Sequence, residues 1–341
     1  MTALRLEMSF SPGSPSDAAD FSREAEELGY SRVGVWDSPA LFREPWVTLA
    51  AIASKTSRIN IGTSVTNPLT RHPVVTAAAA ATLSELAPGR VYLGIGSGDS
   101  GVYNLGHTAS PIDRLREYIV TLKSLFTHGT AEHEGRPVFL SWKPRPVPIY
   151  LSAHGSRSIR LAGEVADGVI MGLGTSPEVI RECLQLLAQG ASAAGRDVTE
   201  IDVWWVTWGI HLDSRPGAAM RDNAWRIGIP THNLGRSTLK GKLVPEQHEA
   251  AVKELAASWK VATYGPTSAD EKNDYTDLAD RLGAKQYLLD RFLIAGTPDE
   301  VEARLRVAVE NGANQFVDMA TSGESAYLRR NAEFVASRFA G

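Results

Sequence analysis

The sequence predicts an α/β fold, a (β/α)8 TIM barrel with a helical insertion after the seventh strand. Short apolar segments rich in β-branched residues alternate with amphipathic segments, as strands and helices do around a parallel sheet. Polar or glycine-rich loops follow the apolar segments, at the edge where such barrels bind ligands. No repeat or linker marks a second domain, so residues 1–341 are predicted to form one domain with the insertion at about 216–292.

The elements can be taken in chain order, because proline and glycine stand at many of their boundaries. The predicted strands are Leu4–Phe10, Ser31–Trp36, Ile59–Val65, Arg90–Ile95, Pro148–Ser152, Gly168–Leu173, Ile201–Leu212 and Gln315–Met319. The predicted helices are Asp17–Leu28, Pro45–Lys55, Val74–Leu86, Ile112–Phe126, Arg157–Val165, Pro177–Ala194, Thr297–Asn311 and Ala326–Phe339. An extra hairpin arm is predicted at His133–Trp142, since Gly135-Arg136-Pro137 is typical of a turn.

The stretch from residue 59 to residue 100 shows the alternation most clearly. Ile59–Val65 is short and β-branched, as a strand buried on both faces should be. Pro68 ends this strand because proline has no N–H group, and Pro73 is well placed to begin a helix. Pro88-Gly89 ends that helix before the next strand, Arg90–Ile95. Two loops therefore leave the carboxyl ends of neighbouring parallel strands.

Composition restricts the class of protein. The chain is 43% hydrophobic and 22% charged, which is ordinary for a globular protein with a large core. The formal net charge of −4 is too small to favour nucleic acid or an anionic membrane as a partner. One cysteine, Cys183, excludes an intramolecular disulfide, and no segment approaches 18 consecutive apolar residues. We therefore expect a soluble cytoplasmic protein.

Polar residues follow three of the predicted strands. Asp37 follows Ser31–Trp36, Asn67 follows Ile59–Val65, and Asp99 follows a glycine run that contains Gly96 and Gly98. Each aspartate is either a helix cap or turn residue or a ligand contact, and the sequence leaves both interpretations open. No helix is predicted directly after the glycine run, so it favours close approach to a flat ligand over a nicotinamide-binding Rossmann site.

A second candidate site lies between the fifth predicted strand and its helix. Gly155 and Ser156 are expected to leave amide N–H groups free at the helix N-terminus, with Arg157 beside them, which suits a phosphate. Capping of the helix by Ser156 is the alternative. Arg71-His72 could bind a second anion or lie in a solvated loop.

Other chemistry is poorly supported by the sequence. The eight histidines show no metal-ligand spacing, so no metal site is predicted. There is no GxSxG elbow and Cys183 has no obvious partner, which argues against nucleophilic hydrolysis. The tryptophans Trp204, Trp205 and Trp208 are predicted to be mostly core, with one of them as a possible wall for a planar ligand.

Several motifs carry a family resemblance: Val65-Thr66-Asn67-Pro68, Thr70-Arg71-His72-Pro73, Ala80-Ala81-Thr82-Leu83 with Gly89-Arg90, Leu93 to Asp99, Leu161 to Gly168, and Ala295-Gly296-Thr297-Pro298. With these motifs the sequence resembles the bacterial luciferase-like superfamily of flavin and deazaflavin enzymes over nearly its whole length. It is most similar to the coenzyme F420-dependent branch typified by methylenetetrahydromethanopterin reductase.

The resemblance implies a specific cofactor site. The third strand would end in a bulge with a cis peptide at Ser64–Val65 behind the deazaflavin ring, and Thr66 and Asn67 would hydrogen-bond the ring edge. The other implied cofactor residues are Gly96, Gly98, His154, Gly155, Ser156 and Arg157. Some F420-dependent alcohol and sugar-phosphate dehydrogenases have a histidine just after the aspartate that corresponds to Asp37. Here Ser38 stands in its place. Reduction of a C=C, C=N or imine-like bond is therefore favoured over alcohol dehydrogenation.

Hydride transfer between C5 of coenzyme F420 and a small organic substrate is the predicted function. Asp37 and Asp99 are the predicted catalytic residues, which would polarise the substrate or ring and relay the compensating proton. The predicted substrate residues are Arg43, Trp46, Trp205, Trp208 and His211. We also expect a homodimer or higher homo-oligomer.

Two alternatives stay open. The first is an FMN-dependent luciferase-like monooxygenase that uses reduced flavin and O2, with a separate flavin reductase as its partner. The second is a barrel that binds flavin or another ligand without turnover. The polar residues retained at three strand ends, Asp37, Asn67 and Asp99, argue against the second alternative.

Overall fold

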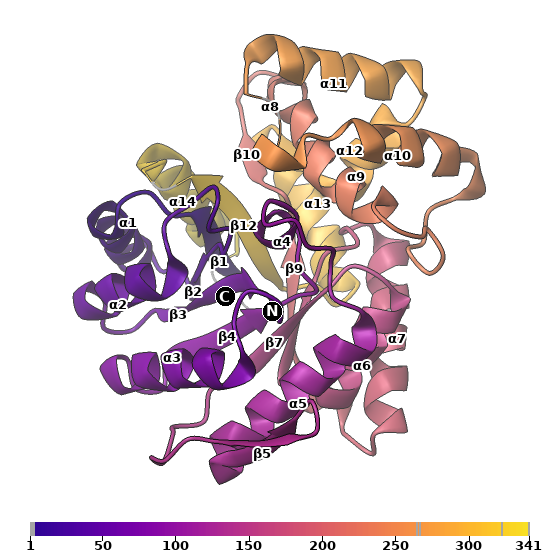
Figure 1. The fold of residues 1–341 in the computed structure, drawn as a ribbon. Helices are drawn as coiled ribbons and strands as arrows, with labels where there is room; N and C mark the ends of the chain where they lie inside the picture. Colours follow the sequence, from indigo (N-terminus) through magenta and orange to yellow (C-terminus); the bar gives the residue numbers. More distant parts are fainter. Residues whose placement is uncertain (1–3, 264, 266, 322, 340–341) are drawn as a thin grey trace.

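A computed structural model describes residues 4–263, 265, 267–321 and 323–339. Eight parallel strands form a closed barrel in the order β1-β12-β9-β8-β7-β4-β3-β2, and helices surround it (Figure 1). The barrel strands are β1 (Arg5–Ser11), β2 (Arg32–Val35), β3 (Asn60–Thr66), β4 (Val91–Ile95), β7 (Ile149–Ala153), β8 (Gly168–Met171), β9 (Asp202–Val206) and β12 (Gln315–Thr321). The predicted (β/α)8 barrel is confirmed.

The barrel helices begin and end close to the predicted residues. They are α1 (Pro15–Glu27), α2 (Pro45–Lys55), α3 (Pro73–Leu86), α5 (Ile112–His128), α6 (Ser156–Val165), α7 (Pro177–Ala193), α13 (Pro298–Glu310) and α14 (Ser325–Phe339). Proline begins several of them, where its missing N–H group costs no helical hydrogen bond. In α13, Thr297 and Glu300 form a reciprocal capping box.

The prediction of one continuous seventh strand over Ile201–Leu212 was wrong, because the structure has two separate strands there. The barrel strand β9 ends at Val206, and the chain resumes as β10 (Ile210–Leu212) in a separate two-stranded sheet with β11 (Ile294–Gly296). Trp208 and Gly209 between them have φ angles of 54° and 124°, outside the extended range, so the strand is interrupted there.

Two smaller elements also differ from the expectation. The predicted hairpin arm is present, but it begins earlier, with β5 (Thr130–His133) and β6 (Arg136–Phe139) around a turn at Glu134 and Gly135. A short helix, α4 (Ser100–Tyr103), follows the glycine run directly, where no helix was expected.

The predicted insertion is helical and lies between β10 and β11. It contains α8 (Ala218–Asn223), α9 (Gly228–Gly235), α10 (Glu246–Ser258), α11 (Ala269–Arg281) and α12 (Lys285–Phe292). Figure 1 shows these helices gathered into one body beside the barrel. Short 3₁₀ turns at Val198–Glu200, Ala224–Ile227 and Val261–Thr263 complete the helical elements that the structure describes.

A buried arginine of α12 fixes the insertion to the barrel. The guanidinium of Arg291 donates to the backbone carbonyls of Leu173, just after β8, and of Lys242 and Leu243 in the insertion. Only 2% of Arg291 is exposed. Because each of these carbonyls is satisfied by a charged donor, the loop that contains Lys242 is held against the barrel.

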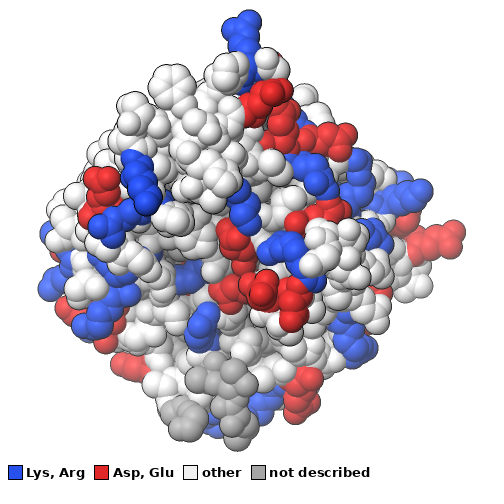
Figure 2. Space-filling model, turned by 90° about the horizontal axis from the view of Figure 1, so that it is seen from below, with Lys and Arg blue, Asp and Glu red and all other residues white. Residues whose placement is uncertain are grey.

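The face drawn in Figure 2 has no large patch of one charge, because Lys and Arg lie among Asp and Glu there. Within the described residues, no helix is long and apolar enough to cross a membrane. The same residues contain no group of three or more His, Cys, Asp or Glu side chains that could hold a metal ion.

Candidate active site

A cavity opens at the carboxyl ends of the barrel strands, between the loops that follow β2, β3 and β4. Most of the predicted site residues line it together: Asp37, Ser64, Val65, Thr66, Asn67, Gly96, Gly98, Asp99, His154 and Trp208. The rest of its wall comes from Trp36, Ser38, Phe42, Ser97, Ser100, Gly101, Ser152, Ile170, Val206, Asn233, Arg236, Val317 and Met319. The cavity therefore combines apolar and aromatic walls with hydroxyl groups and a few charged groups.

The end of β3 bulges toward this cavity. The peptide bond Ser64–Val65 is cis, and the register with β4 shifts between Thr63 and Thr66. The predicted bulge and cis bond are therefore confirmed. Glycines of β4 and its loop make room for the bulge: a Cβ on Gly94 would lie 2.1 Å from the carbonyl oxygen of Thr63, and one on Gly96 would lie 3.1 Å from Val65.

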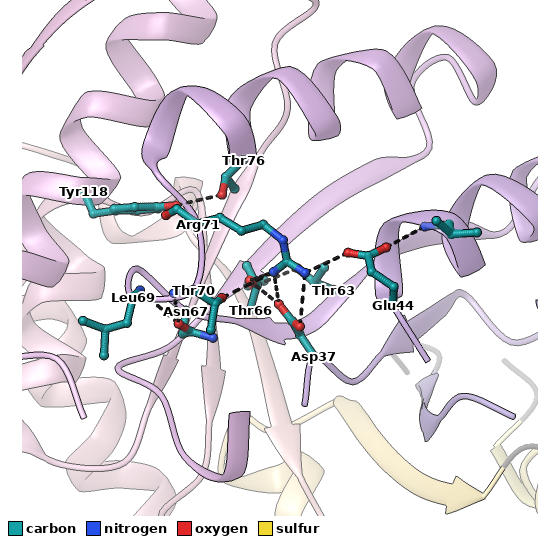
Figure 3. A network of polar contacts seen from close by, with 12 residues as sticks. Asp37, Glu44, Thr63, Thr66, Asn67, Leu69, Thr70, Arg71, Thr76 and Tyr118 are labelled. Carbon is teal, nitrogen blue, oxygen red and sulfur yellow. Dashed lines mark hydrogen bonds and ion pairs between the residues drawn. The ribbon is translucent and has the colours of Figure 1, made fainter. Parts of the chain in front are cut away.

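Asp37 is neither a helix cap nor a free carboxylate. Its Oδ2 atom accepts from the Thr66 hydroxyl at 2.6 Å and from Nη1 of Arg71 at 2.5 Å (Figure 3). The Asp37 side chain is fully buried, and that of Arg71 is 15% exposed. An ion pair this deeply buried, with a second hydrogen bond from Thr66, holds the carboxylate in a fixed position.

Arg71 is itself held by a second carboxylate and by its backbone. Its Nη2 atom donates to Glu44 at 2.7 Å, and its carbonyl oxygen accepts from the Tyr118 hydroxyl at 2.9 Å. Burial acts to lower the pKa of Arg71, but the hydrogen bond and charge of Asp37, followed by Glu44, outweigh burial and raise it. The sequence left open whether Arg71 binds an anionic ligand or lies in a solvated loop. In the structure, Arg71 instead binds the carboxylates of Asp37 and Glu44.

Asn67 shapes the loop after β3. Its Oδ1 atom accepts from the backbone N–H groups of Leu69 and Thr70, which forms a side-chain turn. Asn67 is only 3% exposed and lines the cavity. Its oxygen is therefore occupied, and the amide nitrogen is the part of the side chain left for a ligand.

Asp99 is held by residues of the insertion. Its Oδ1 atom lies 3.2 Å from Nε2 of His232 and 3.5 Å from Nη1 of Arg236. Burial acts to raise the pKa of Asp99, but the hydrogen bond from His232 and the charge of Arg236 outweigh it, so the pKa lies below its ordinary value. Asp99 makes no capping hydrogen bond to α4, so the cap alternative does not describe it.

A second pocket continues from the cavity, with Ser97, Ser152, His154, Asn233 and Arg236 shared between the two. Its cations are Arg157, Arg236, Lys240 and Lys242, and no Asp or Glu is among the described residues that line it. Its hydroxyl groups come from Ser97, Ser110, Ser152, Ser156, Ser158, Ser237 and Thr238. We call this the cationic pocket, and its chemistry suits an anion.

Lys242 is the most buried cation of the cationic pocket. It is 7% exposed, and its Nζ atom donates to the carbonyl oxygens of Asn233 and Leu234 at 2.8 Å each. Burial, and then the nearby charge of Arg236, lowers the pKa of Lys242 to about 8. Among the described residues, the hydrogen-bond acceptors of Lys242 are these two neutral carbonyls, and an anionic ligand would complete this environment.

The start of α6 differs from the prediction in one respect. The backbone N–H of Ser156 is not free, because it donates to the carbonyl oxygen of Gly241 at 2.9 Å. Ser156 does not cap the helix with its side chain either, since Gly155 is the N-cap residue without a side-chain bond. The insertion therefore covers this helix end, and Lys242 lies close to Gly155.

His154 is neutral at physiological pH. Burial, with the charges of Arg236 and Lys242, lowers its pKa to about 3. Its Nε2 atom lies 3.1 Å from the Ser152 hydroxyl. Gly172 provides the space for the ring, because a Cβ there would lie 2.1 Å from an atom of His154. His154 is therefore a poor base in this site.

Several predicted substrate residues lie away from the cavity. Trp205 is fully buried in the core where β9 pairs with β12, and His211 is 5% exposed and packs on Tyr327. Arg43 is exposed, and Trp46, in the first turn of α2, packs partly buried against the hydrophobic core. None of these four side chains lines the cavity. Strand periodicity turns Trp205 to the core, whereas Trp208 reaches the cavity through its positive φ angle.

The insertion residues of the site were missed by the sequence analysis. Asn233, Arg236, Lys240 and Lys242 all follow β10 by at least twenty positions. A signal was present: residues 224–245 contain four Lys or Arg and no Asp or Glu. Such a one-sign stretch in an otherwise mixed insertion indicates an anion-binding segment.

The sequence is similar to those of known proteins over most of its length. The model of the luciferase-like monooxygenase family matches residues 3–315. The chain is 29% identical over 315 residues to the 5,10-methylenetetrahydromethanopterin reductase of Methanolobus tindarius, over 89% of this chain and 91% of that protein. It is 30% identical over 325 residues to the F420-dependent glucose-6-phosphate dehydrogenase of Nakamurella multipartita, over 87% of this chain and 95% of that protein.

A solved structure has the same fold. The coenzyme F420-dependent tetrahydromethanopterin reductase from Methanopyrus kandleri superposes with a TM-score of 0.74 and 21% sequence identity. The match covers 99% of this chain and 100% of that chain.

Proposed function

Since the chain belongs to the luciferase-like monooxygenase family, we propose that it is a coenzyme F420-dependent oxidoreductase that transfers a hydride between the deazaflavin C5 and a small organic substrate. The observation that carries this proposal is the continuity of the cavity with the cationic pocket. A planar ring group with a phosphate-bearing tail would use both parts at once.

The residues present fit such a cofactor. Glycines at Gly96 and Gly98 leave the cavity wall without side chains where a flat ring would lie. The cationic pocket offers Lys242 and Arg236 for a phosphate, with Arg157 at the start of α6. A relative that is described as F420-dependent, the glucose-6-phosphate dehydrogenase of Nakamurella multipartita, supports the choice of this cofactor over FMN.

The cofactor would supply the hydride chemistry, and the chain would supply binding, orientation and a dry site. Ser64, Val65, Thr66 and Asn67 would hold the ring from the side of the β3 bulge. Asp37, held in place by Arg71, would orient a hydrogen-bond donor of the substrate or ring. Asp99 would hold the insertion and its cations over the site.

For the two aspartates we propose a more limited role than the proton relay that the sequence predicts. An acid must be protonated before it can donate. Asp37 is ion-paired with Arg71, and the pKa of Asp99 lies below its ordinary value. We therefore propose that the two aspartates accept hydrogen bonds and orient the groups that donate them, and that water supplies the compensating proton. This role stays a prediction that substitution of each aspartate tests.

An FMN-dependent monooxygenase is the second candidate, because the matching family is described as luciferase-like monooxygenases. The cavity offers no feature that would exclude a flavin of similar shape. Oxygen consumption separates the two functions. With reduced cofactor and substrate, the proposed reductase should consume no O2 beyond the blank, whereas a monooxygenase should consume about one O2 for each product formed.

A further inference from the structure

Ser38 and Ser100 form a buried hydroxyl pair in the cavity wall. The Ser38 hydroxyl donates to the Ser100 oxygen at 2.9 Å, although 62 residues separate them. Ser38 is 3% exposed and Ser100 is 6% exposed, and both line the cavity. In the described part of the chain, no acceptor is found for the hydroxyl hydrogen of Ser100. This hydrogen is therefore left for a ligand.

The backbone holds this pair together. Ser100 begins α4, and α4 lies directly on the loop after β2, because a Cβ on Gly101 would lie 2.5 Å from the carbonyl oxygen of Asp37. Only glycine permits this close approach without displacement of one of the two loops. A hydroxyl that already accepts a hydrogen bond is a stronger donor, so the bond from Ser38 increases the donor strength of Ser100.

The two carboxylates that line the cavity are already paired with basic groups. Asp37 is paired with Arg71, and Asp99 is paired with His232 and Arg236. A cationic iminium substrate would need an uncompensated carboxylate, and neither aspartate offers one. An alcohol to be oxidised would need a base, and His154 with a pKa of about 3 is a weak one.

We propose that Ser100, supported by Ser38, is the hydrogen-bond donor for the carbonyl oxygen of the substrate, and that the substrate class is a neutral conjugated carbonyl compound with a flat apolar body. This rests on the proposed function, because it needs a hydride donor. Trp36, Phe42, Trp208 and Met319 provide the apolar wall for such a body.

A hydride adds to the carbon β to the carbonyl, and the π electron pair of the C=C bond shifts so that negative charge develops on the carbonyl oxygen. The Ser100 hydroxyl stabilises this charge, as an oxyanion-hole donor does. Water then gives a proton to the α-carbon, and the saturated carbonyl compound forms. The two electrons come from reduced deazaflavin, which is oxidised.

The first test needs no cofactor. 4-(Dimethylamino)cinnamaldehyde is a conjugated aldehyde whose absorption moves to longer wavelength when its carbonyl accepts a hydrogen bond. We expect this red shift when the probe binds to the apoprotein. Ser100→Ala should remove most of the shift and raise the probe Kd by about three- to tenfold, the effect of one lost hydrogen bond. Ser38→Ala should remove a smaller part, and Ser100→Thr should retain it.

A matched control is Ser84→Ala, at a buried serine of α3 that does not line the cavity. This variant should give the wild-type shift and affinity. An unchanged red shift in both Ser100→Ala and Ser38→Ala, or no shift in the wild type, would overturn the proposal. If Ser100→Ala does not fold, Ser38→Ala and Ser100→Thr decide the question in the same measurement.

A second test separates this inference from the proposed function. With F420 bound in reduced form, Ser100→Ala should slow reduction of a conjugated enone by about 10²-fold, while the F420 Kd stays unchanged. If the protein shifts the probe but binds no F420, the cofactor assignment is wrong and the carbonyl site stands. If F420 binds normally and the serine variants shift the probe like the wild type, the carbonyl site is wrong.

Discussion

The carboxylate of Asp99, after β4, lies 3.2 Å from Nε2 of His232 in α9, although 133 residues separate the two. This contact joins the barrel to the insertion at the cavity wall. Arg236 strengthens the same joint, because it donates to the carbonyl oxygen of Gly98 and to the hydroxyl of Ser97. The insertion therefore forms part of the site.

The first prediction concerns the pH dependence of stability at this joint. The pKa of Asp99 is lowered in the folded protein, so its ionised form stabilises the fold above the unfolded pKa of about 3.9. This contribution is lost as the pH falls through the folded pKa. Asp99→Asn should lower the free energy of unfolding by about 1–3 kcal/mol at pH 7, with a smaller difference below about pH 4.

Urea unfolding between pH 3 and pH 7 checks this prediction, with Asp277→Asn on the exposed face of α11 as the control. The control should follow the wild-type curve within about 0.5 kcal/mol. An Asp99→Asn deficit that stays constant over the whole pH range would contradict the ionised role of Asp99.

The second prediction concerns Asp37. Asp37→Asn removes the charge that holds Arg71 but keeps the size of the side chain. We expect normal F420 binding and turnover at least tenfold slower. Full loss of general acid–base help would slow turnover by about 10²–10⁴-fold. Single-turnover kinetics and F420 titration give the two quantities separately.

Asp20→Asn is the control for Asp37→Asn, because it breaks an exposed ion pair with Lys55 far from the cavity. It should leave turnover unchanged. Wild-type turnover in Asp37→Asn would leave Asp37 with a purely structural role in the Arg71 network.

The third prediction concerns Lys242. Lys242→Met removes a buried charge from the cationic pocket, so the F420 Kd should rise about 10- to 100-fold, the usual effect of a charge-assisted hydrogen bond. Because the pKa of Lys242 is about 8, F420 affinity of the wild type should fall as the pH rises through 8. Lys253→Met, on the exposed part of α10, should change neither quantity.

A titration of both variants between pH 6.5 and pH 9.5 measures these effects. The pH dependence should be weaker in Lys242→Met than in the wild type. If Lys242→Met binds F420 with the wild-type affinity and the wild-type pH dependence, Lys242 is not part of the anion site.

The fourth prediction concerns Gly155. Its Cβ would lie 3.8 Å from Lys242, which is ordinary contact, so Gly155→Ala fits the backbone. A bulky residue would instead fill the cationic pocket. Gly155→Leu should therefore raise the F420 Kd clearly more than Gly155→Ala does. Equal and unchanged Kd values in two folded variants would place the phosphate elsewhere.

Local sequence patterns were sufficient to predict most of the helices and strands. Proline at helix starts such as Pro73 and short β-branched strands such as Ile59–Val65 carry their structure in a few neighbouring residues. The break in the seventh strand at Trp208 was missed because an apolar run gives no sign of a change in sheet. Gly209 was the local signal for it.

The site divides in the same way. Residues at strand ends, such as Asp37 and Asp99, could be placed because barrel topology brings these ends together. Their partners could not, since Arg71 and His232 reach them through loop and insertion packing that has no sequence period. The prediction of a free N–H group at Ser156 was wrong for the same reason: this group donates to the carbonyl oxygen of Gly241 in the insertion.

The most direct test of the proposed function is a titration of the apoprotein with F420 and, separately, with FMN. Quenching of tryptophan fluorescence, to which Trp36 and Trp208 at the cavity contribute, gives both dissociation constants. The F420 assignment predicts F420 binding at least about tenfold tighter than FMN binding, a difference of about 1.4 kcal/mol. FMN binding about tenfold tighter than F420 binding would contradict the F420 assignment and favour the monooxygenase.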